Sequence, residues 1–458
     1  DTTLRDGQQT QGVTFSLDDK LRISQLLADI GIDYIEGGWP GANPIDSEFF
    51  DRKKEFAKSK LVAFGMTKRF GRSVENDETL AQVVSAGTSV VCLVGKSHDF
   101  HVQKALGISL DENIELITSS IEHLKSLGKE VHFDAEHFFD GFAANKKYAI
   151  SIVKEAMAAG ADWVVLCDTN GGCMPNQVTE TIESLIEEGV DASRLGIHAH
   201  NDTENAVANS LAAVQAGVRQ IQGTLNGLGE RCGNANLISL LPTLLLKPQF
   251  AEKFVTGVTS DSLKEITRAS RIMDDVLNRV PNRFAPYVGS SAFAHKAGLH
   301  ANAILKDTET YEHIDPELVG NERIIPVSNQ AGLSNLREKL QQAGIKADDD
   351  TGKLSMLLKE IKDKESEGYS FDSANASFEI FARRMLGQMP NFFEVKRYRV
   401  TTERRKDTIG NTKTLSEAVV VLKIGDKETL SVSESMDEEM NDLGPVNALS
   451  KAISKDLG

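Results

Sequence analysis

The chain has 458 residues and a formal net charge of -16 at pH 7, from 51 Lys and Arg against 67 Asp and Glu. This acidic balance argues against a nucleic acid or an anionic membrane as the partner, because binding to phosphate depends on clustered basic side chains. The length exceeds what one hydrophobic core normally holds, so we expect two or three domains. No apolar run approaches the ~20 residues needed to span a bilayer.

The cysteines are few and show no disulfide spacing: Cys92, Cys167, Cys173 and Cys232. Together with the absence of a visible signal peptide, this usage favours a reducing compartment, so we expect a cytoplasmic protein. The chain opens inside a strand-like motif without a starting Met, and we therefore expect a few residues to precede Asp1.

Residues 1–250 alternate short apolar runs of strand type with longer helical patterns, such as Leu17–Ile30 and Asn145–Ala159. The predicted strands are Thr2–Leu4, Asp33–Trp39, Leu61–Thr67, Val90–Lys96, Glu130–His137, Trp163–Gly172, Arg194–Asp202 and Gln220–Gly229. Eight such units predict an α/β fold of the (β/α)8 TIM-barrel type rather than an open doubly wound sheet. No Gly-x-Gly-x-x-Gly follows the first strand, which weakens the dinucleotide-binding alternative.

The pattern changes after the barrel. We expect helical linker subdomains over residues 251–370 and a C-terminal α/β domain over residues 371–458. The last part contains strand candidates at Phe393–Thr402, Ala418–Ile424 and Glu428–Val432, and a closing helix with Pro445 in its first turn. Because it carries no catalytic constellation, we interpret it as a regulatory or dimerisation domain.

Polar residues follow the predicted barrel strands at their C-terminal ends, where TIM barrels place their active sites. They are Asp6, Glu36, Lys96, Glu136, Asp168, Thr169, His198, His200 and Asn234. Side chains two apart in a strand point the same way, so His198 and His200 face one spot. They could be two satisfied core histidines, but the nearby Asp6 and Asn234 favour a divalent metal with positions open for a chelating substrate. Mg, Mn and Zn are all compatible with these ligands.

Several of the other residues have two interpretations. Arg5 could form an ordinary surface ion pair, but its place at the end of the first strand favours donation to a carbonyl oxygen that becomes negative in a transition state. Thr169 caps a turn or binds a substrate carboxylate, and Glu136 is a structural acceptor or a group that orients substrate or moves a proton. We expect Glu36 to hold Arg5 or a backbone turn rather than to do chemistry. The histidines that we expect to be structural are His98, His101, His123, His132 and His137.

Three motifs resemble the TIM-barrel acyltransferase family that includes the 2-isopropylmalate, homocitrate and citramalate synthases. They are Asp1–Gln9 (DTTLRDGQQ), Gly196–Asp202 (GIHAHND) and Gly229–Asn236 (GERCGNAN). Longer stretches are similar to the citramalate synthase branch: Glu36–Pro44, Ala135–Gly141 and Thr310–Arg323. The resemblance covers nearly the whole chain.

The resemblance implies a Claisen condensation of acetyl-CoA with pyruvate that gives citramalate and free CoA, in isoleucine and branched-chain amino-acid biosynthesis. It implies Asp6, His198, His200 and Asn234 as metal ligands, and Arg5, Gln9, Glu136 and Thr169 around the 2-oxo acid. It also implies that His300 and Tyr311 act in acetyl enolisation, reaching the barrel of the partner protomer of a homodimer. The base would be His300, or Glu136 through a water. The C-terminal domain would bind a branched-chain amino acid as effector.

Other functions remain open at this point. The same chemistry could act on 2-oxoisovalerate or 2-oxoglutarate, as in a 2-isopropylmalate or homocitrate synthase. A metal-dependent lyase or aldolase would explain the barrel but not the C-terminal domain. A catalytically silent sensor of a branched-chain amino acid, using residues after about Ser377, is disfavoured by the intact constellation at the barrel mouth.

Overall fold

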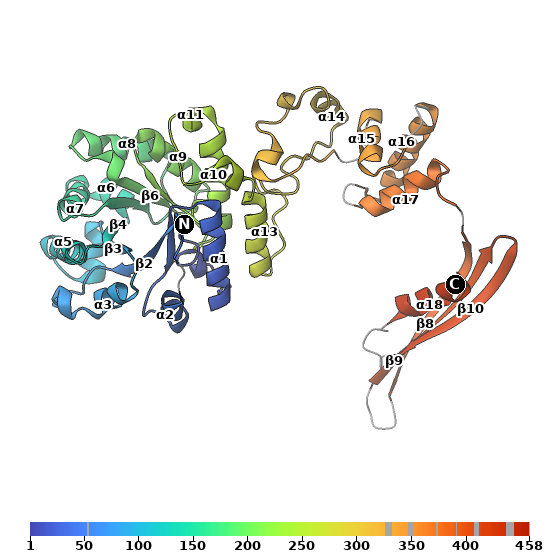
Figure 1. The fold of residues 1–458 in the computed structure, drawn as a ribbon, viewed down its shortest axis with the longest axis horizontal. Coiled ribbons are helices and arrows are strands. Elements are labelled where there is room, and N and C mark those ends of the chain that lie inside the picture. Colours follow the sequence, from blue (N-terminus) through green and yellow to red (C-terminus); the bar gives the residue numbers. More distant parts are fainter. Residues whose placement is uncertain are drawn as a thin grey trace. The chain divides into compact units, whose positions relative to one another are not determined.

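The computed structural model describes residues 1–52, 55–325, 332–346, 351–371, 374–390, 392–406, 412–436 and 444–457. The chain forms two compact units, one of residues 1–295 and 300–325, the other of residues 296–299 and 326–458 (Figure 1). Among the described residues, none of the helices combines the length and the apolar character needed to cross a membrane.

The first unit is built on a curled sheet of seven parallel strands in the order of the chain, β1 to β7. The strands are β1 (Tyr34–Gly38), β2 (Lys60–Met66), β3 (Val90–Lys96), β4 (Glu130–Glu136), β5 (Trp163–Asp168), β6 (Leu195–Ala199) and β7 (Gln220–Gln222). Helices follow the strands, as a TIM barrel requires. They are α1 (Leu17–Ile30), α2 (Pro44–Asp51), α3 (Glu78–Ser85), α4 (Asp99–His101), α5 (Leu110–Ser126), α6 (Phe138–Ala144), α7 (Lys146–Ala158), α8 (Pro175–Glu187), α9 (Ala206–Ala216) and α10 (Leu237–Leu246). The predicted barrel class is confirmed.

The prediction of a strand at Thr2–Leu4 is wrong, because this segment turns instead of extending. The first two residues nevertheless occupy the eighth position of the barrel. The Thr2 amide donates to the Gly223 oxygen at 2.9 Å, and the Glu36 amide donates to the Asp1 oxygen at 2.9 Å. Asp1 and Thr2 therefore connect β1 to the chain that follows β7. The tight turn after them places Arg5 and Asp6 at the barrel mouth.

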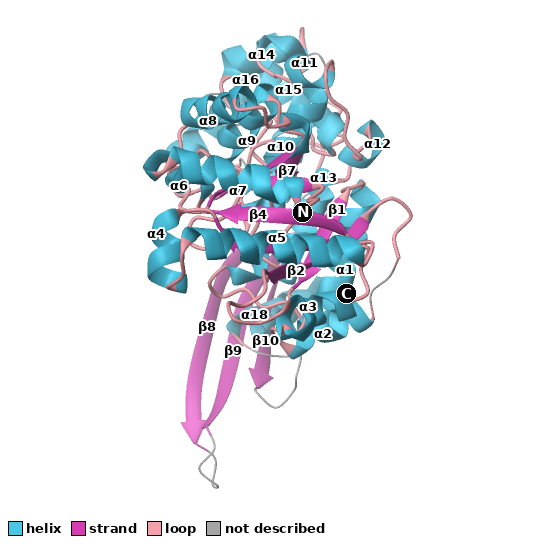
Figure 2. Ribbon diagram, turned by 90° about the vertical axis from the view of Figure 1, so that its left-hand side faces the viewer, coloured by secondary structure: helices cyan, strands magenta, loops and turns pink. Residues whose placement is uncertain are grey.

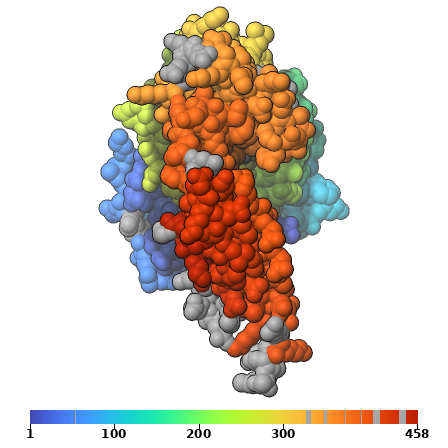
Figure 3. Space-filling model, turned by 90° about the vertical axis from the view of Figure 1, so that its right-hand side faces the viewer, coloured from blue at the N-terminus to red at the C-terminus, as the bar shows by residue number. Residues whose placement is uncertain are grey.

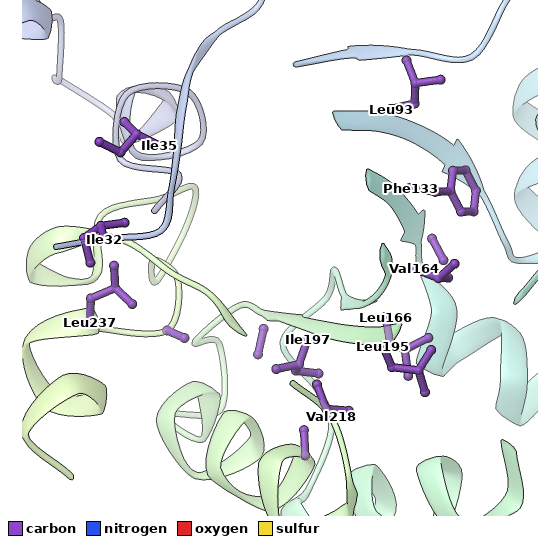
Figure 4. Packing of buried hydrophobic residues seen from close by; sticks show 14 of the residues in the cluster. Ile32, Ile35, Leu93, Phe133, Val164, Leu166, Leu195, Ile197, Val218 and Leu237 are labelled. Carbon is purple, nitrogen blue, oxygen red and sulfur yellow. The ribbon is translucent and has the colours of Figure 1, made fainter. Parts of the chain in front are cut away.

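The core lies between the strands and the helices, because alternate strand residues point outward. Most side chains that point outward from the strands are fully buried under the helices. Leu93, Phe133 and Ile197 are among them, and Figure 4 shows several of these side chains. Helices α5 and α7 lie against β4, and the helical layer around the strands is seen in Figure 2. The ends of α1 are fixed locally, since the Ser16 hydroxyl accepts from the Asp19 amide and Gly31 takes the left-handed conformation.

Most barrel strands end earlier than the sequence patterns predicted, whereas β3 ends at Lys96 as predicted. β6 stops at Ala199 and β7 at Gln222, so His200 and the Gly227–Asn234 segment belong to loops. These loops are tied down all the same, because His200 pairs with Asn234 in an isolated bridge. His200 and Asn234 thus lie on loops at the C-terminal ends of the strands, and their mutual pairing fixes these loops.

After the barrel the first unit continues with α11 (Pro248–Ala251), α12 (Ser260–Leu263) and α13 (Ile266–Val276), and α14 (Gly298–Ile304) follows at the boundary between the units. The second unit contains α15 (Leu333–Gln342), α16 (Thr351–Ser366) and α17 (Asn375–Met385). The C-terminal part is an antiparallel sheet of β8 (Glu394–Lys406), β9 (Thr412–Ile424) and β10 (Lys427–Met436), in the order β10-β9-β8. Helix α18 (Pro445–Leu457) packs on it, and this part is red in Figure 3.

Candidate active site

Four buried polar side chains converge at the mouth of the barrel. The Nε2 atom of His198 lies 3.0 Å from Oδ2 of Asp6 and 3.3 Å from Nε2 of His200. Asn234 donates through Nδ2 to the same Asp6 oxygen at 2.7 Å. Asp6, His198 and His200 present ligand atoms that all lie within 4.8 Å of one another. The structure therefore brings together the four residues that the sequence predicted as metal ligands.

These spacings suit a divalent cation. Ligand atoms at about 2.1 Å and at right angles around a cation are separated by about 3 Å, close to the His198 distances. Asp6 and His200 are wider, at 3.9 Å. The Oδ1 atom of Asn234 is buried without a hydrogen-bond partner among the described residues, as is Nδ1 of His200. In this arrangement Nδ2 of Asn234, rather than Oδ1, faces the cluster, so an oxygen ligand requires a half-turn of the amide.

Asp6 and the two histidines shift one another's pKa values. Burial would raise the pKa of Asp6, but Arg5 and the hydrogen bond from His198 outweigh it and hold the pKa well below its usual range. Burial would lower the pKa of His198, yet its hydrogen bond and attraction to Asp6 raise the pKa. For His200 burial prevails, with repulsion from His198, and lowers the pKa to about 4. Asp6 is therefore an anion, and His200 is a neutral imidazole with a lone pair to offer.

Gly229 leaves the space that Asn234 occupies. A Cβ atom at position 229 would come within 1.8 Å of Oδ1 of Asn234. This contact is far shorter than any that side chains tolerate, so only glycine fits beside the amide. The loop therefore needs its glycine for the placement of a predicted ligand.

Arg5 lies beside the cluster and is held in place from two sides. Its Nε donates to the Glu36 carboxylate, and its guanidinium lies 3.9 Å from the centre of the Phe64 ring. NH1 is 3.6 Å from Asp6. Burial would lower the pKa of Arg5, but Glu36 and Asp6 raise it, so the group stays charged. As expected, Glu36 holds Arg5, which leaves part of the guanidinium free to donate.

Two other predicted residues, Glu136 and Thr169, lie where the neighbouring strands β4 and β5 end. Glu136 ends β4 and pairs with Lys96 at the end of β3. The Thr169 hydroxyl accepts from the His137 amide at 2.8 Å, so it braces the loop after β4 instead of capping its own turn. His137 itself has a φ of +59°, which is costly for a residue with a side chain. It stacks on His101 at 4.0 Å, so two histidines expected to be structural meet beside Glu136.

Arg231 was missed by the sequence analysis. It donates to both carboxylate oxygens of Asp202 at 2.8 Å each, and its NH2 also donates to the main-chain oxygen of Thr169 at 2.8 Å. It adopts a φ of +55° to do so. Arg231 therefore ties three mouth loops together, those after β5, β6 and β7. The only available signal was its place between Gly229 and Gly233.

Other predicted residues lie apart from this network. Gln9 ends a short 3-10 helix (Gly7–Gln9) with its side chain exposed. The rings of His300 and Tyr311 stack on each other with centroids 4.1 Å apart, and Tyr311 is 45% exposed. Next to Tyr311, the buried Glu312 pairs with Arg323 and with His295 at 3.1 Å. This ion cluster anchors the segment that carries the ring pair.

A second buried group of potential ligands lies deeper in the barrel. Glu36, Cys92 and Asp134 have ligand atoms within 4.8 Å of one another. Arg5 pairs with Glu36, so a cation is already present there as the guanidinium.

A cavity of about 820 Å³ lies at the opposite end of the barrel, lined by residues at the strand starts such as Tyr34, Lys60 and Trp163. That end is not the catalytic face of a TIM barrel.

Comparison with known proteins gives two domain matches and several relatives. Residues 1–270 match the family described as HMGL-like, and residues 287–368 match the homocitrate synthase post-HMGL domain. An (R)-citramalate synthase of Aquifex aeolicus is 47% identical over the whole chain and 84% of its own length. An (R)-citramalate synthase of Geobacter sulfurreducens is 46% identical with the same coverage. The HMG-CoA lyase of Bacillus subtilis shares the fold, with a TM-score of 0.52 and 19% identity over 61% of this chain and 94% of the lyase.

Proposed function

This chain belongs to the HMGL-like family, within its (R)-citramalate synthase branch, and from that premise we propose how its residues divide the work of the condensation. The protein is an acyltransferase that joins the acetyl group of acetyl-CoA to pyruvate. The observation that carries the assignment of the site is the convergence of Asp6, His198 and His200 at one point of the barrel mouth.

We propose that Asp6, His198, His200 and Asn234 hold a divalent cation. Such a cation supplies chelation of the carboxylate and keto oxygens of the 2-oxo acid, and draws electrons from the keto carbon. The proposal is supported by the burial of these residues and by the close spacing of the ligand atoms of Asp6, His198 and His200. The donor set of two imidazoles and two oxygens does not select among Mg, Mn and Zn.

Arg5 acts on the oxygen that becomes negative during the reaction. A base removes a proton from the acetyl methyl group, and the resulting carbanion forms a carbon–carbon bond with the keto carbon of pyruvate. Negative charge moves to the keto oxygen, where the Arg5 guanidinium donates a hydrogen bond. The alkoxide takes up a proton, water adds to the thioester carbonyl carbon, the carbon–sulfur bond breaks, and the sulfur leaves as free CoA beside citramalate. The double tether of Arg5 by Glu36 and Phe64 supports this role, since a fixed donor needs no reorganisation.

Glu136, Thr169 and Gln9 are proposed to contact the 2-oxo acid, and His300 with Tyr311 to assist proton removal. The base is His300, or Glu136 through a water. Glu136 lies partly exposed at a strand end of the catalytic face, which supports its access to substrate. Gln9 and the His300–Tyr311 pair are exposed, which supports contacts made only with substrate or with a partner protomer.

We also propose that the protein is a cytoplasmic homodimer whose C-terminal domain, residues 371–458, binds a branched-chain amino acid. One face of the C-terminal sheet supports the dimer. Leu430 pairs with Val421 and Val432 with Val419, on the face opposite the buried Val420 and its α18 neighbours. Leu430 is 61% exposed, so this face is an apolar surface open to a second copy.

The test of the function is release of free thiol from acetyl-CoA, compared among pyruvate, 2-oxoisovalerate and 2-oxoglutarate, with and without a chelator. A chelator-sensitive preference for pyruvate is expected. A preference for a larger acid would keep the chemistry and move the substrate. No release with any of the three would contradict the proposed site and favour the lyase or sensor alternatives.

A further inference from the structure

His198 turns its two ring nitrogens to different partners. Nε2 points into the ligand cluster, whereas Nδ1 lies 2.7 Å from Oε1 of Gln222 on the adjacent strand β7. The Nε2 atom of Gln222 in turn donates to Oδ1 of Asp134 on β4 at 2.9 Å. All three side chains are buried, with exposed fractions of 5%, 7% and 3%. A carboxylate, an amide and an imidazole thus form a chain across the inside of the barrel.

The positions of the protons in the hydrogen bonds between Asp134, Gln222 and His198 follow from the chemistry of these groups. An imidazole nitrogen that binds a cation must offer a lone pair, so with a cation bound Nε2 of His198 would carry no proton, in place of its present contact with Asp6, and Nδ1 would carry it. Nδ1 then donates to Oε1 of Gln222. A carboxylate only accepts, so Asp134 attracts the amide NH2 of Gln222 and fixes the direction of that amide. The reversed amide would place NH2 against the Nδ1 proton and an oxygen against the carboxylate, losing both hydrogen bonds.

We propose that Gln222, oriented by Asp134, is a positioning residue that sets the tautomer and ring orientation of His198 for the cation. This inference deepens the proposed metal site and rests on it. Neither Gln222 nor Asp134 is a proposed ligand of the cation, and both act on it through His198, although Asp134 also lies beside Glu36 and Cys92.

The same strand contains a matched control. Gln220 lies two residues before Gln222, on the same face, and its Nε2 atom is 3.3 Å from Nδ1 of His132. Here the amide nitrogen, not the oxygen, faces the imidazole, and His132 lies away from the ligand cluster beside Glu130. Both glutamines are buried amides paired with a histidine, so replacing either disturbs the barrel interior in a similar way. Only Gln222 reaches a proposed ligand.

The experiment measures binding of Mn²⁺ alone by calorimetry, on the full chain, for the native protein, Gln222→Met and Gln220→Met. We expect Gln222→Met to weaken Mn²⁺ binding by about 10- to 100-fold. Gln220→Met should leave the affinity within about threefold of native, even where both variants lower the melting temperature. Nitrogen-15 spectra of labelled histidine, recorded with diamagnetic Mg²⁺ in place of Mn²⁺, give a second readout, in which Gln222→Met, but not Gln220→Met, loses the Nδ1–H form of His198.

Asp134 supplies an independent pair of variants, should Gln222→Met fail to fold. Asp134→Asn keeps an acceptor oxygen for Gln222, so its Mn²⁺ affinity should stay nearer to native than that of Asp134→Leu, which has none. Equal affinities for these two, or equal losses for the two glutamine variants, would overturn the positioning role of Gln222 while the metal site stands. Failure of the native protein to bind Mn²⁺ would overturn the metal site itself and the positioning role with it.

Discussion

The ammonium group of Lys20 donates to the main-chain oxygen of Leu4 at 2.9 Å, directly before Arg5 and Asp6. Lys20 is fully buried, donates also to the Gly37 oxygen at 3.1 Å, and pairs with Asp46. A buried cation thus joins the turn that carries Arg5 to the strand end that carries Glu36. Two groups at the catalytic face depend on one side chain outside it.

Lys20→Met should lower the free energy of unfolding by about 3–5 kcal/mol, because it leaves the Asp46 carboxylate buried without its counter-charge. Chemical denaturation measures the loss. Adding Asp46→Asn should recover part of it by removing the uncompensated charge. Arg22→Met, an exposed change on the same helix, is the control and should cost less than about 0.5 kcal/mol. A loss below about 1 kcal/mol for Lys20→Met would contradict this account.

Arg231→Gly should reduce kcat/KM by roughly tenfold or more, because the tie between Asp202 and Thr169 is lost and the substrate loops lose their placement. Glycine accepts the positive φ of residue 231, so the backbone is not strained by the change. Steady-state kinetics and a melting curve are the measurements. Glu230→Gln is the matched control, since Glu230 approaches Arg231 only at 3.9 Å. Equal kinetic effects at positions 230 and 231 would argue against the tie.

Gly229→Ala should displace Asn234 from the cluster, because the added methyl group would overlap Oδ1. A shift of about 1 Å at a reacting centre costs on the order of 100-fold in rate. Gly172→Ala on the loop after β5 is the control, since a Cβ there meets nothing within 4 Å. The two variants are compared by thiol release and by Mn²⁺ binding. Undiminished Mn²⁺ binding by Gly229→Ala would exclude Asn234 as a ligand.

His300→Ala should collapse turnover and leave bound metal unchanged, because His300 is proposed to act on the acetyl group and not on the cation. Metal content by atomic absorption, beside thiol release, makes the distinction. If the ring pair serves the partner's barrel, mixing His300→Ala with the separately inactive His198→Ala should restore roughly a quarter of native activity. Loss of metal in His300→Ala would contradict the proposed role of His300 on the acetyl group. No recovery on mixing, under conditions of subunit exchange, would contradict its action in the partner's barrel.

The cluster of Asp6, His198 and His200 could be found from the sequence because local rules place it. A two-residue strand period puts both histidines on one side, and a barrel gathers strand ends at one mouth. Gln222 and Asp134 escaped notice, although the spacing of Gln220 and Gln222 is the same two-residue signal. Their contact joins positions 88 residues apart, and it depends on the register of three strands.

Local patterns also failed where the bend of a segment depends on the hydrogen bonds that it makes. Thr2–Leu4 has the composition of a strand, but the Thr2 oxygen accepts from three successive amides, those of Arg5, Asp6 and Gly7, and so forms a turn. Arg231 escaped for a related reason, because its positive φ is imposed by the bonds it makes to Asp202 and Thr169. Neither effect has a period that a sequence reading could detect.

Acid should reveal the role of Glu130 at the other end of the barrel. Its hydrogen bond with His132, aided by Lys60 and Tyr34, outweighs burial and lowers the pKa from 4.5 to about 2. A lowered folded-state pKa means that the folded chain favours the anion, so the stabilisation is complete above pH 4.5 and is lost as the pH falls toward 2. Glu130→Gln should therefore be less stable than the native protein near neutral pH, and this difference should shrink in acid.

Melting temperatures of both proteins between about pH 6 and about pH 3 measure this difference. The exposed Glu48, paired with Arg52 on α2, supplies the control, and Glu48→Gln should change stability by less than about 0.5 kcal/mol. Because the group stabilises only as an anion, the native and Glu130→Gln curves must approach each other on the acid side. A difference that widens as the pH falls would mean that the folded state prefers the protonated carboxyl, and that the bonds to His132 and Lys60 do not outweigh burial.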